Sequence, residues 1–411
     1  MRRVPWSHGV FAAVMLALVG GLGWDGGARD ATAQAGKVRI GVVLPLSGQF
    51  AVGAVNPKRG YDLAAEEINK AGGIKALGGA QIELVYADNQ GKQDVSIGET
   101  ERLIQQEKVA AIMGAWHSPS TVAGTQAAER GKTPWVVEVA SADIILERGF
   151  KYVTRVNVKA SWYGEAPVDF LDYAKSTLKM KVDRVAIMYT DDDWGRSSVA
   201  KGTKNALTKR GYQIVEEIAY PSATQDVTTY ITKIKASRPD AFVVTSFPND
   251  ALLVARAVEQ LGLKVPIAVG VSSGYVQPPF RSNLGPIAEK WLVVGGWNPD
   301  IPGAKPLADV FKTKYGVDMN EHAALSYQTL FVLKEAIEQA RSTDRDKIND
   351  ALHAIKIGPG PLMVMPYTGI EFDQTGQNPH ARELMLQVRE GALVTVWPEK
   401  FASQKPALPF R

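Results

Sequence analysis

Short apolar runs rich in valine and isoleucine alternate, from Val38 onward, with longer stretches that have helical periodicity. Between the first two runs, apolar residues recur at the spacing i, i+3, i+4, i+7 of one helical face, at Tyr61, Ala64, Ala65 and Ile68. Gly72 and Gly73 then end the predicted helix, as glycines commonly do. Strands that alternate with helices are typical of parallel sheets covered by helices on both faces, so the pattern predicts an α/β fold.

The apolar runs fall into two series, which predict two lobes of parallel sheet flanked by helices. In the first series the strands are expected at residues 38–44, 81–86, 109–113 and 135–139. The second series begins after 152–155, with strands near 184–189, 214–219, 241–245 and 266–269 and helices near 163–179, 197–209, 227–235 and 249–261. The C-terminal third breaks the alternation, with helices expected at 305–315, 323–341 and 345–354 and short strands near 384–388 and 393–397.

The first 35 residues have the pattern of a secretory signal peptide. Arg2 and Arg3 give a positive start, residues 10–23 are apolar apart from glycines, and 31–33 or 33–35 offers a cleavage site between small residues. An uncleaved membrane anchor is the alternative, but this apolar run is shorter than the roughly 20 residues that span a bilayer. We therefore expect a cleaved signal and an exported, extracytoplasmic protein.

Composition narrows the function classes further. The chain has 411 residues, 45% of them hydrophobic and 22% charged, which is enough to bury a full core and favours two domains. Its 47 basic and 43 acidic residues give a net charge of only +4, without a dense Lys/Arg run, so nucleic acid is not an expected partner. The absence of cysteine excludes disulfides, thiolate metal sites, cysteine nucleophiles and a lipid-modified cysteine anchor. Neither a phosphate-binding loop nor metal-ligand histidine spacing is present, so we expect no metal and no cofactor.

The loops after the strands of the first lobe are the first candidates for chemistry, because ligands of parallel sheets lie at the carboxyl ends of the strands. Ser118 has the position of a helix N-cap with Pro119 as the first helical residue, and Ser141 is a hydroxyl at the next strand end. Two hydroxyls and free backbone N–H groups at one crevice would suit a carboxylate or a similar polar head. The alternative for each serine is helix capping alone.

Aromatic side chains stand at several of the same strand ends. Trp116 and His117 precede Ser118 and would form a wall for an apolar ligand, with packing between the lobes as the alternative. In the second lobe Trp194 and Phe247 are placed to close over a ligand. The three aspartates at 191–193 lack the spaced ligands of a calcium loop, which favours a solvated turn and a charged helix start.

The segment 270–274 matches the Gly-x-Ser-x-Gly elbow of serine hydrolases, with Ser272 as its serine. An elbow needs a helix directly afterwards, whereas the Gln-Pro-Pro at 277–279 is not expected to start one. Histidines that could complete a triad follow at 322, 353 and 380, but a chain of this length offers such candidates by chance. A hydrolase is therefore kept only as the weaker alternative.

A family resemblance emerges from the opening of the predicted first lobe. The segments IGVVLPLSG at 40–48, Arg59-Gly60 and AAEEINKAGGI at 64–74 resemble the branched-chain amino acid (Leu/Ile/Val) type of periplasmic solute-binding proteins of ABC transporters, and Asp88, 103–114, 147–150 and Arg155 continue the likeness. The resemblance implies a type I periplasmic binding protein fold, with two lobes joined by three crossovers near 156–159, 297–301 and 357–361. It would place 36–157 and 300–358 in lobe 1, and 158–299 and 359–411 in lobe 2.

The resemblance also implies roles for individual residues. Ser118 and Ser141 stand where the family places hydroxyls on the ligand carboxylate, together with backbone groups around Val139, and Trp116 stands at an apolar wall. Trp194 stands where amino-acid binders carry a closing tyrosine.

Two departures from the family pattern affect the expected ligand. Ser272 replaces the glutamate that meets the ligand ammonium, and the first-loop tyrosine becomes Val52 or its neighbour. A buried ammonium without a paired carboxylate would be costly. Glu138 or Asp191 could substitute, and otherwise aromatic acids, other carboxylates or amides become candidate ligands.

The expected function is thus that of a monomeric solute-binding component of an ABC importer, which closes its lobes over a small ligand and delivers it to a membrane permease. No covalent chemistry is expected, and the chain is not expected to be an enzyme. An exported ligand-sensing module of the same fold is the main alternative.

Overall fold

The strands predicted in the first third of the chain pair into one parallel sheet in the computed structural model, which describes residues 36–360 and 362–411. The strand order is β2-β1-β3-β4-β5, and every pair is parallel. The strands are β1 (Lys37–Leu44), β2 (Gln81–Asp88), β3 (Ala111–Gly114), β4 (Trp135–Val137) and β5 (Val153–Arg155). β4 ends two residues before the predicted end at 139, so Glu138 and Val139 belong to the loop at its carboxyl end.

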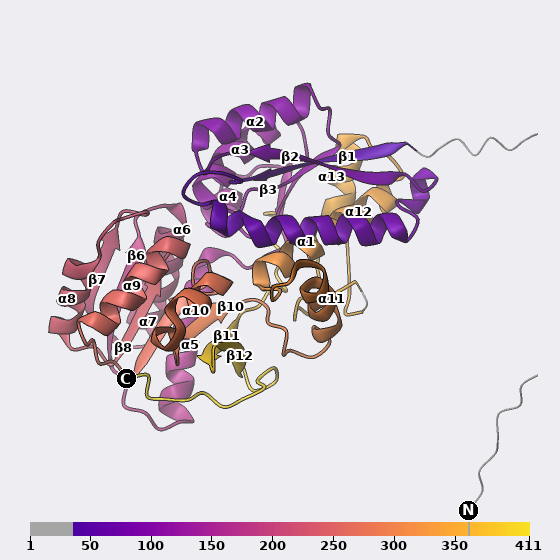
Figure 1. Ribbon diagram of the computed structural model, residues 1–411. Helices are drawn as coiled ribbons and strands as arrows, with labels where there is room; N and C mark the ends of the chain where they lie inside the picture. The colour runs from indigo at the N-terminus through magenta and orange to yellow at the C-terminus, as the bar shows by residue number, and fades with distance from the viewer. Residues whose placement is uncertain (1–35, 361) are drawn as a thin grey trace, which may run out of the picture. The chain divides into compact units, whose positions relative to one another are not determined.

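The helices grouped with this sheet come from two separate parts of the chain, one before residue 150 and one in the last third. They are α1 (Ala51–Lys70), η1 (Lys75–Leu77), α2 (Gln93–Gln105), α3 (Ser118–Arg130) and α4 (Ile144–Glu147), and, from the last third, α11 (Lys305–Tyr315), α12 (Glu321–Ala340) and α13 (Arg345–Ala354). The predicted apolar face of α1 is buried, and α1 lies along α12 (Figure 1). Gly60 makes this close approach possible, because a Cβ there would lie 2.2 Å from the carbonyl oxygen of Ala323.

The second sheet has seven strands in the order β12-β11-β10-β9-β8-β6-β7. They are β6 (Arg184–Thr190), β7 (Gln213–Tyr220), β8 (Ala241–Thr245), β9 (Ile267–Val271), β10 (Leu292–Gly295), β11 (Leu384–Arg389) and β12 (Ala392–Trp397). The first five are parallel, whereas β11 and β12 return from the end of the chain as antiparallel strands on one edge. The α/β prediction is therefore confirmed, with two antiparallel strand pairings added to one sheet.

The helices that connect the second sheet include one that the sequence analysis excluded. They are α5 (Ala160–Ser176), α6 (Asp193–Gly195), the π-helical η2 (Arg196–Thr203), α7 (Lys204–Lys209), α8 (Thr228–Ser237), α9 (Pro248–Gln260), α10 (Pro278–Leu284) and the 3₁₀ turn η3 (Gly285–Ala288). The expectation that Gln-Pro-Pro cannot start a helix is wrong, since α10 begins at Pro278. Proline suits the first turn of a helix, where its missing N–H would have no intrahelical partner.

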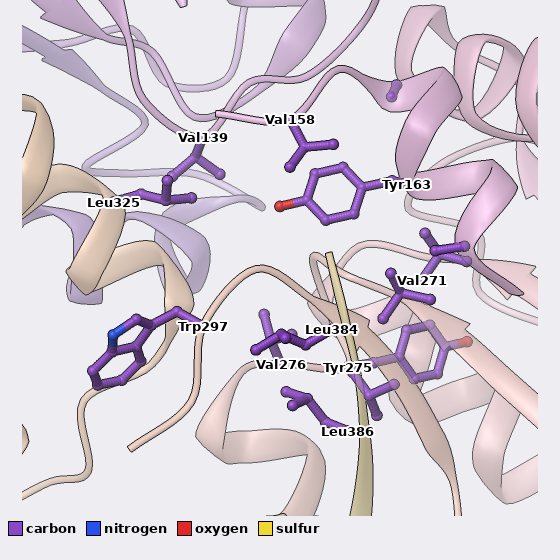
Figure 2. Packing of buried hydrophobic residues seen from close by; sticks show 14 of the residues in the cluster. Val139, Val158, Tyr163, Val271, Tyr275, Val276, Trp297, Leu325, Leu384 and Leu386 are labelled. Carbon is purple, nitrogen blue, oxygen red and sulfur yellow. The ribbon is translucent and has the colours of Figure 1, made fainter. Parts of the chain in front are cut away.

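Hydrogen bonds at the end of β5 join two chain segments that are more than 200 residues apart in the sequence. Arg155 Nε donates to Gln377 Oε1 at 2.8 Å, and Gln377 Nε2 donates to the Asn157 carbonyl at 2.7 Å. The largest buried apolar cluster also joins distant segments: Figure 2 shows Val139, Tyr163 and Leu384 within one region of packed apolar side chains.

The described residues belong to one compact unit, and none of their helices combines the length and the hydropathy needed to cross a membrane. The predicted signal peptide, residues 1–35, lies outside the described residues. The predicted lobe boundaries stay a prediction.

Candidate functional site

A small cavity lies where the carboxyl ends of strands from both sheets meet. Its lining consists of Trp116, Ser118, Val139, Ser141, Trp194, Phe247, Ser272, Ser273 and His322. Apart from His322, each lining residue lies in a loop or first helical turn that follows β3, β4, β6, β8 or β9. Every residue predicted for a ligand site is thus brought here except His117. That these residues bind a ligand stays a prediction.

The cavity measures about 20 Å³, which is room for about one water molecule. A ligand the size of an amino acid therefore enters only if the side chains around the cavity move apart.

The loop after β3 places Trp116 against the first helix. Trp116 has a left-handed φ of 62°, and a Cβ at Gly53 of α1 would lie 2.1 Å from its Cζ2 atom. Only a glycine at position 53 leaves room for the indole, so α1 supports the wall that Trp116 makes.

Ser118 is not the N-cap of α3, contrary to the expectation. His117 is the N-cap residue, Ser118 is the first residue of the helix, and Ser118 Oγ accepts a hydrogen bond from the Ala142 N–H at 3.2 Å. Because that bond uses a lone pair of the hydroxyl, the Ser118 O–H remains a donor.

Arg155 holds the neighbouring loop after β4. Its Nη1 donates to the carbonyls of Ser141 and Ala142 at 2.8 and 2.9 Å. The guanidinium is buried, and this burial lowers its pKa to about 10. Arg155 and Ser118 together fix the position of Ser141 in the cavity wall.

The apolar walls from the second sheet meet those from the first. Trp194 lies in α6, which begins just after its N-cap Asp192, and the Asp192 carboxylate accepts the N–H groups of Trp194 and Gly195, both at 2.9 Å. The Phe247 ring centroid lies 5.1 Å from that of Trp194 and 5.9 Å from that of Trp116. Asp192 is thus a helix cap, as the sequence analysis favoured over a calcium ligand for this turn.

His117 lies behind this wall and does not line the cavity. Its ring stacks on Phe50 at a centroid distance of 4.3 Å, and its Nδ1 lies 2.9 Å from Ser120 Oγ. Burial lowers the pKa of the His117 imidazole to about 3, so the ring is neutral at physiological pH. The contacts of His117 match the alternative of structural packing.

His322, at the start of α12, is the polar lining residue with the best-defined hydrogen-bonding role. Trp116 Nε1 donates to His322 Nδ1 at 3.1 Å, and Gln277 Nε2 lies 2.8 Å from the same atom. Because an indole N–H can only donate, Nδ1 accepts and the ring proton is on Nε2. Burial lowers the pKa of the imidazole to about 3, and Nε2 has no partner among the described residues. His322 is therefore a neutral ring with one free N–H donor.

Ser272 and Ser273 form a tight turn after β9, with left-handed φ values of 44° and 37°. Ser273 Oγ is buried without a partner among the described residues. The nearby Ser272 hydroxyl favours the ionised form of Glu321, whose Oε1 accepts the Gly296 N–H at 2.7 Å and the Tyr163 hydroxyl. Burial nevertheless raises the pKa of Glu321 to about 7.

None of the residues that line this cavity is charged. Asp191 is exposed and pairs with Arg196 at 3.4 Å, and Glu138 is fully buried beside Tyr61 and does not reach the lining. The structure brings neither of the two expected ammonium partners into the cavity. Glu321, one layer behind Ser272, is the carboxylate in contact with the lining.

Sequence reasoning missed Ser273 and Glu321 as members of this region, and it named His322 only as a possible triad member in the hydrolase alternative. Ser273 adjoins Ser272 and could have been included by adjacency alone. His322 and Glu321 lie in α12, roughly 200 residues from Trp116, and nothing in their local pattern distinguishes them from other helix starts.

Comparison with known proteins identifies the family of the chain. The family model described as "Periplasmic binding protein" matches residues 37–391. "Leu/Ile/Val-binding protein homolog 7" of Brucella suis biovar 1 (strain 1330) is 30% identical over 387 residues, which cover 90% of this chain and 94% of the relative.

Solved structures give the same fold. A leucine binding protein of Thermotoga maritima MSB8 matches with a TM-score of 0.76 and 25% identity, over 87% of this chain and 97% of its own. A solute binding protein of an ABC transporter from Rhodopseudomonas palustris BisB5, solved with 3,4-dihydroxy benzoic acid, matches with a TM-score of 0.77 and 22% identity, over 90% and 98% of the two chains. The expected fold class and solute-binding role are confirmed: the chain belongs to the periplasmic binding protein family.

Proposed function

We propose that this chain is the extracytoplasmic solute-binding component of an ABC importer and that it carries a small carboxylate-bearing ligand to a membrane permease. The observation that carries the ligand class is the cavity lining, in which neutral hydrogen-bond donors face aromatic walls and no side chain is charged. Relatives named for binding Leu/Ile/Val and the neighbour solved with a dihydroxybenzoic acid support a ligand of this size.

The carboxylate head would be held by neutral donors. Ser118 and Ser141 offer hydroxyls, and His322 offers the N–H at Nε2 that its other hydrogen bonds leave free. The positive end of α3, which begins at Ser118, adds to the attraction for an anion. The apolar body of the ligand would pack between Trp116, Phe247 and Trp194.

Ligands without an ammonium group are favoured over amino acids by this lining. An ammonium buried among Ser272, Ser273 and the aromatic rings would have no carboxylate in direct contact. Glu321 lies near Ser272 but does not line the cavity. Aromatic or branched aliphatic carboxylates therefore head the list of candidate ligands.

Binding would involve a hinge motion of two lobes, 36–157 with 300–358 and 158–299 with 359–411. Lining residues come from loops of both sheets, and the cavity of about 20 Å³ is too small for such a ligand without opening. Ligand would then select the closed arrangement, which the permease recognises. The proposed protein is a monomer with no nucleic-acid partner, exported by the signal at 1–35.

Catalysis by Ser272 is not part of this proposal, for a reason of proton placement. A triad base needs an unprotonated Nε2 toward the serine and a carboxylate on Nδ1–H. His322 has the opposite tautomer, since its Nδ1 accepts from Trp116. His353 and His380 contact Lys151 and Glu371 instead and do not line the cavity.

A thermal-shift panel tests the proposed function, because a ligand that binds only the folded state raises the melting temperature. Leucine, isoleucine, valine, phenylalanine, benzoate, 4-methylpentanoate and urea would each be added to the purified protein. We expect stabilisation by benzoate or 4-methylpentanoate and weaker stabilisation by the amino acids. Stabilisation by leucine alone would overturn the argument from the uncharged lining.

Variants then connect binding to the cavity. Ser118→Ala and Trp194→Ala should each weaken the binding of the stabilising compound at least tenfold. The matched controls are Ser282→Ala, at an exposed serine, and Trp162→Ala, at a tryptophan outside the lining, and neither should change the affinity. Unchanged affinity in both site variants would place the ligand elsewhere. A ligand-sensing role would be favoured instead if deletion of the gene left uptake of that compound intact.

A further inference from the structure

A second, larger cavity is lined by residues of α10, of the start of α12 and of β12. It measures about 220 Å³, against about 20 Å³ for the first cavity. Its lining shares no residue with the first and consists of Val276, Arg281, Trp297, Asn298, Pro299, Asp300, Asp318, Met319, Asn320, Glu321, Ala392 and Leu393. The cavity is therefore a separate space that the proposed function does not use.

Arg281 is the unusual member of this lining. Its guanidinium makes no hydrogen bond and no ion pair within 4.0 Å with the described residues, and its Nη1 atom is buried from solvent. Burial lowers the pKa of Arg281, while the negative charge of Asp318 opposes that change. Arg281 as a whole is half-buried, so the unfavourable feature is the single buried Nη1 without a partner, which an anion could satisfy.

The carboxylates in the same lining are engaged elsewhere. Asp300 accepts from the Thr395 N–H at 2.7 Å and from the Ser403 hydroxyl at 2.5 Å. Asp318 pairs with Lys312 at 2.9 Å. Arg281 is thus the charged side chain of the cavity that has no direct partner among the described residues.

Glu321 adds a second unsatisfied polar group to the lining. Its Oε1 accepts the Gly296 N–H at 2.7 Å, whereas its Oε2 is buried without a partner among the described residues. Burial raises the pKa of this carboxyl to about 7, so its protonated form can donate to an oxygen of a bound anion near neutral pH.

The rest of the lining is mainly apolar. Val276, Trp297, Pro299, Met319, Ala392 and Leu393 contribute this surface. Trp297 is almost fully buried, and its indole N–H is already bonded to the Val364 carbonyl at 2.9 Å, so the ring offers hydrocarbon surface rather than a donor. A bare inorganic anion would leave this surface without a contact.

We propose that this cavity is a second binding site, which takes a small organic carboxylate with its carboxylate group on Arg281 and its hydrocarbon body against Trp297, Met319 and Leu393. A guanidinium binds a carboxylate with two parallel hydrogen bonds, which suits a group with no other partner. Ligand in this site is additional to ligand in the first cavity.

The probe for this site is 4-bromobenzoate, whose bromine can be located in crystals by anomalous scattering. Soaked crystals should show bromine in the second cavity, with the carboxylate on Arg281. In solution, calorimetric titration would use the Ser118→Ala/Trp194→Ala protein, so that binding to the first cavity is weakened. Arg281→Gln in that background should weaken the remaining binding on the order of ten- to a hundredfold. Arg256→Gln, at an exposed arginine of α9, should leave it unchanged.

Stability of the ligand-free protein separates a binding role from a structural one. Because Arg281 has no partner, Arg281→Met should melt at the same temperature as the wild type or above it. A fall of several degrees would show that the arginine has a structural partner, which overturns the proposal.

Three other results would also overturn it. Bromine in the second cavity of soaked crystals with no Arg281-dependent binding in solution would mean binding at crystal concentration only. Equal affinity of Arg281→Gln and its parent would mean that Arg281 does not hold the carboxylate. Inorganic phosphate bound as tightly as 4-bromobenzoate would mean that the apolar lining plays no part. Each of these results concerns binding to the second cavity, so the proposed transport function, which rests on the first cavity, would stand.

Discussion

Replacing Glu138 by glutamine should remove a large part of the pH dependence of stability. Glu138 is fully buried, and neither carboxylate oxygen has a hydrogen bond of good geometry among the described residues. Burial raises its pKa from 4.5 to about 7, although backbone groups of Val139 and Trp116 and the Tyr61 hydroxyl partly oppose the rise. Between these two values the folded protein holds a proton that the unfolded chain has released, so the stability falls as the pH rises.

The magnitude follows from the two pKa values. Each unit of difference corresponds to about 1.4 kcal/mol, and integration from pH 5 to pH 8 gives a loss of about 2.5 kcal/mol from this one group. Glutamine has nearly the same shape and does not titrate. The free energy of unfolding of Glu138→Gln relative to wild type should therefore rise by about 2.5 kcal/mol between pH 5 and pH 8.

Urea denaturation at pH 5, 6, 7 and 8 measures this difference, with Glu399→Gln as the control at an exposed carboxylate. Subtraction of the two proteins cancels the other titrating groups, such as Glu321. A difference that stays constant across the pH range would refute the reasoning, because it would mean that Glu138 is ionised and satisfied throughout. Since Glu138 does not line the cavity, ligand affinity should not change.

Three further predictions concern packing, capping and acid stability. Gly60→Ala should destabilise the protein by about 1–3 kcal/mol in urea denaturation, because its Cβ would overlap the Ala323 carbonyl. The control Gly98→Ala, in open space on α2, should be neutral or stabilising. Equal denaturation midpoints for the two variants would argue against the close contact between α1 and α12. Asp192→Ala should lower stability by about 1 kcal/mol in the same assay through loss of its two N–H contacts. Burial lowers the pKa of His117 to about 3, so between pH 7 and pH 5 only the unfolded chain takes up this proton and the wild type loses stability. His117→Gln should recover about 2 kcal/mol of that loss. If urea denaturation gives the same fall in the free energy of unfolding from pH 7 to pH 5 for both proteins, the prediction is contradicted.

Much of the fold was predictable because it depends on local patterns. The apolar face of α1 is buried as its spacing predicted, and α11 and α13 have the predicted bounds. These elements are encoded by periodicity and by terminating glycines, which act over a few residues. α10 was missed because proline was taken as a breaker, although in the first helical turn it is favourable.

Part of the site was predictable for a topological reason. Parallel strands place their carboxyl ends on one edge of a sheet, so Ser118, Ser141, Trp194 and Phe247 could be grouped from sequence positions far apart. The family resemblance assigned them expected roles. The resemblance could not predict which neighbouring side chains line the cavity and which point away from it.

The sequence by itself determined the alternation of strands and helices, the loops that carry the candidate site and the exclusion of cysteine chemistry. Only the tertiary structure decided that Glu138 and Asp191 stay out of the cavity, that the Trp116 indole sets the tautomer of His322, and that Arg281 lacks a partner. The physical reason is that local periodicity specifies elements, whereas hydrogen-bond partners and burial depend on which distant segments pack together. A charge, a tautomer or a pKa is set by those neighbours, and no pattern along the chain records them.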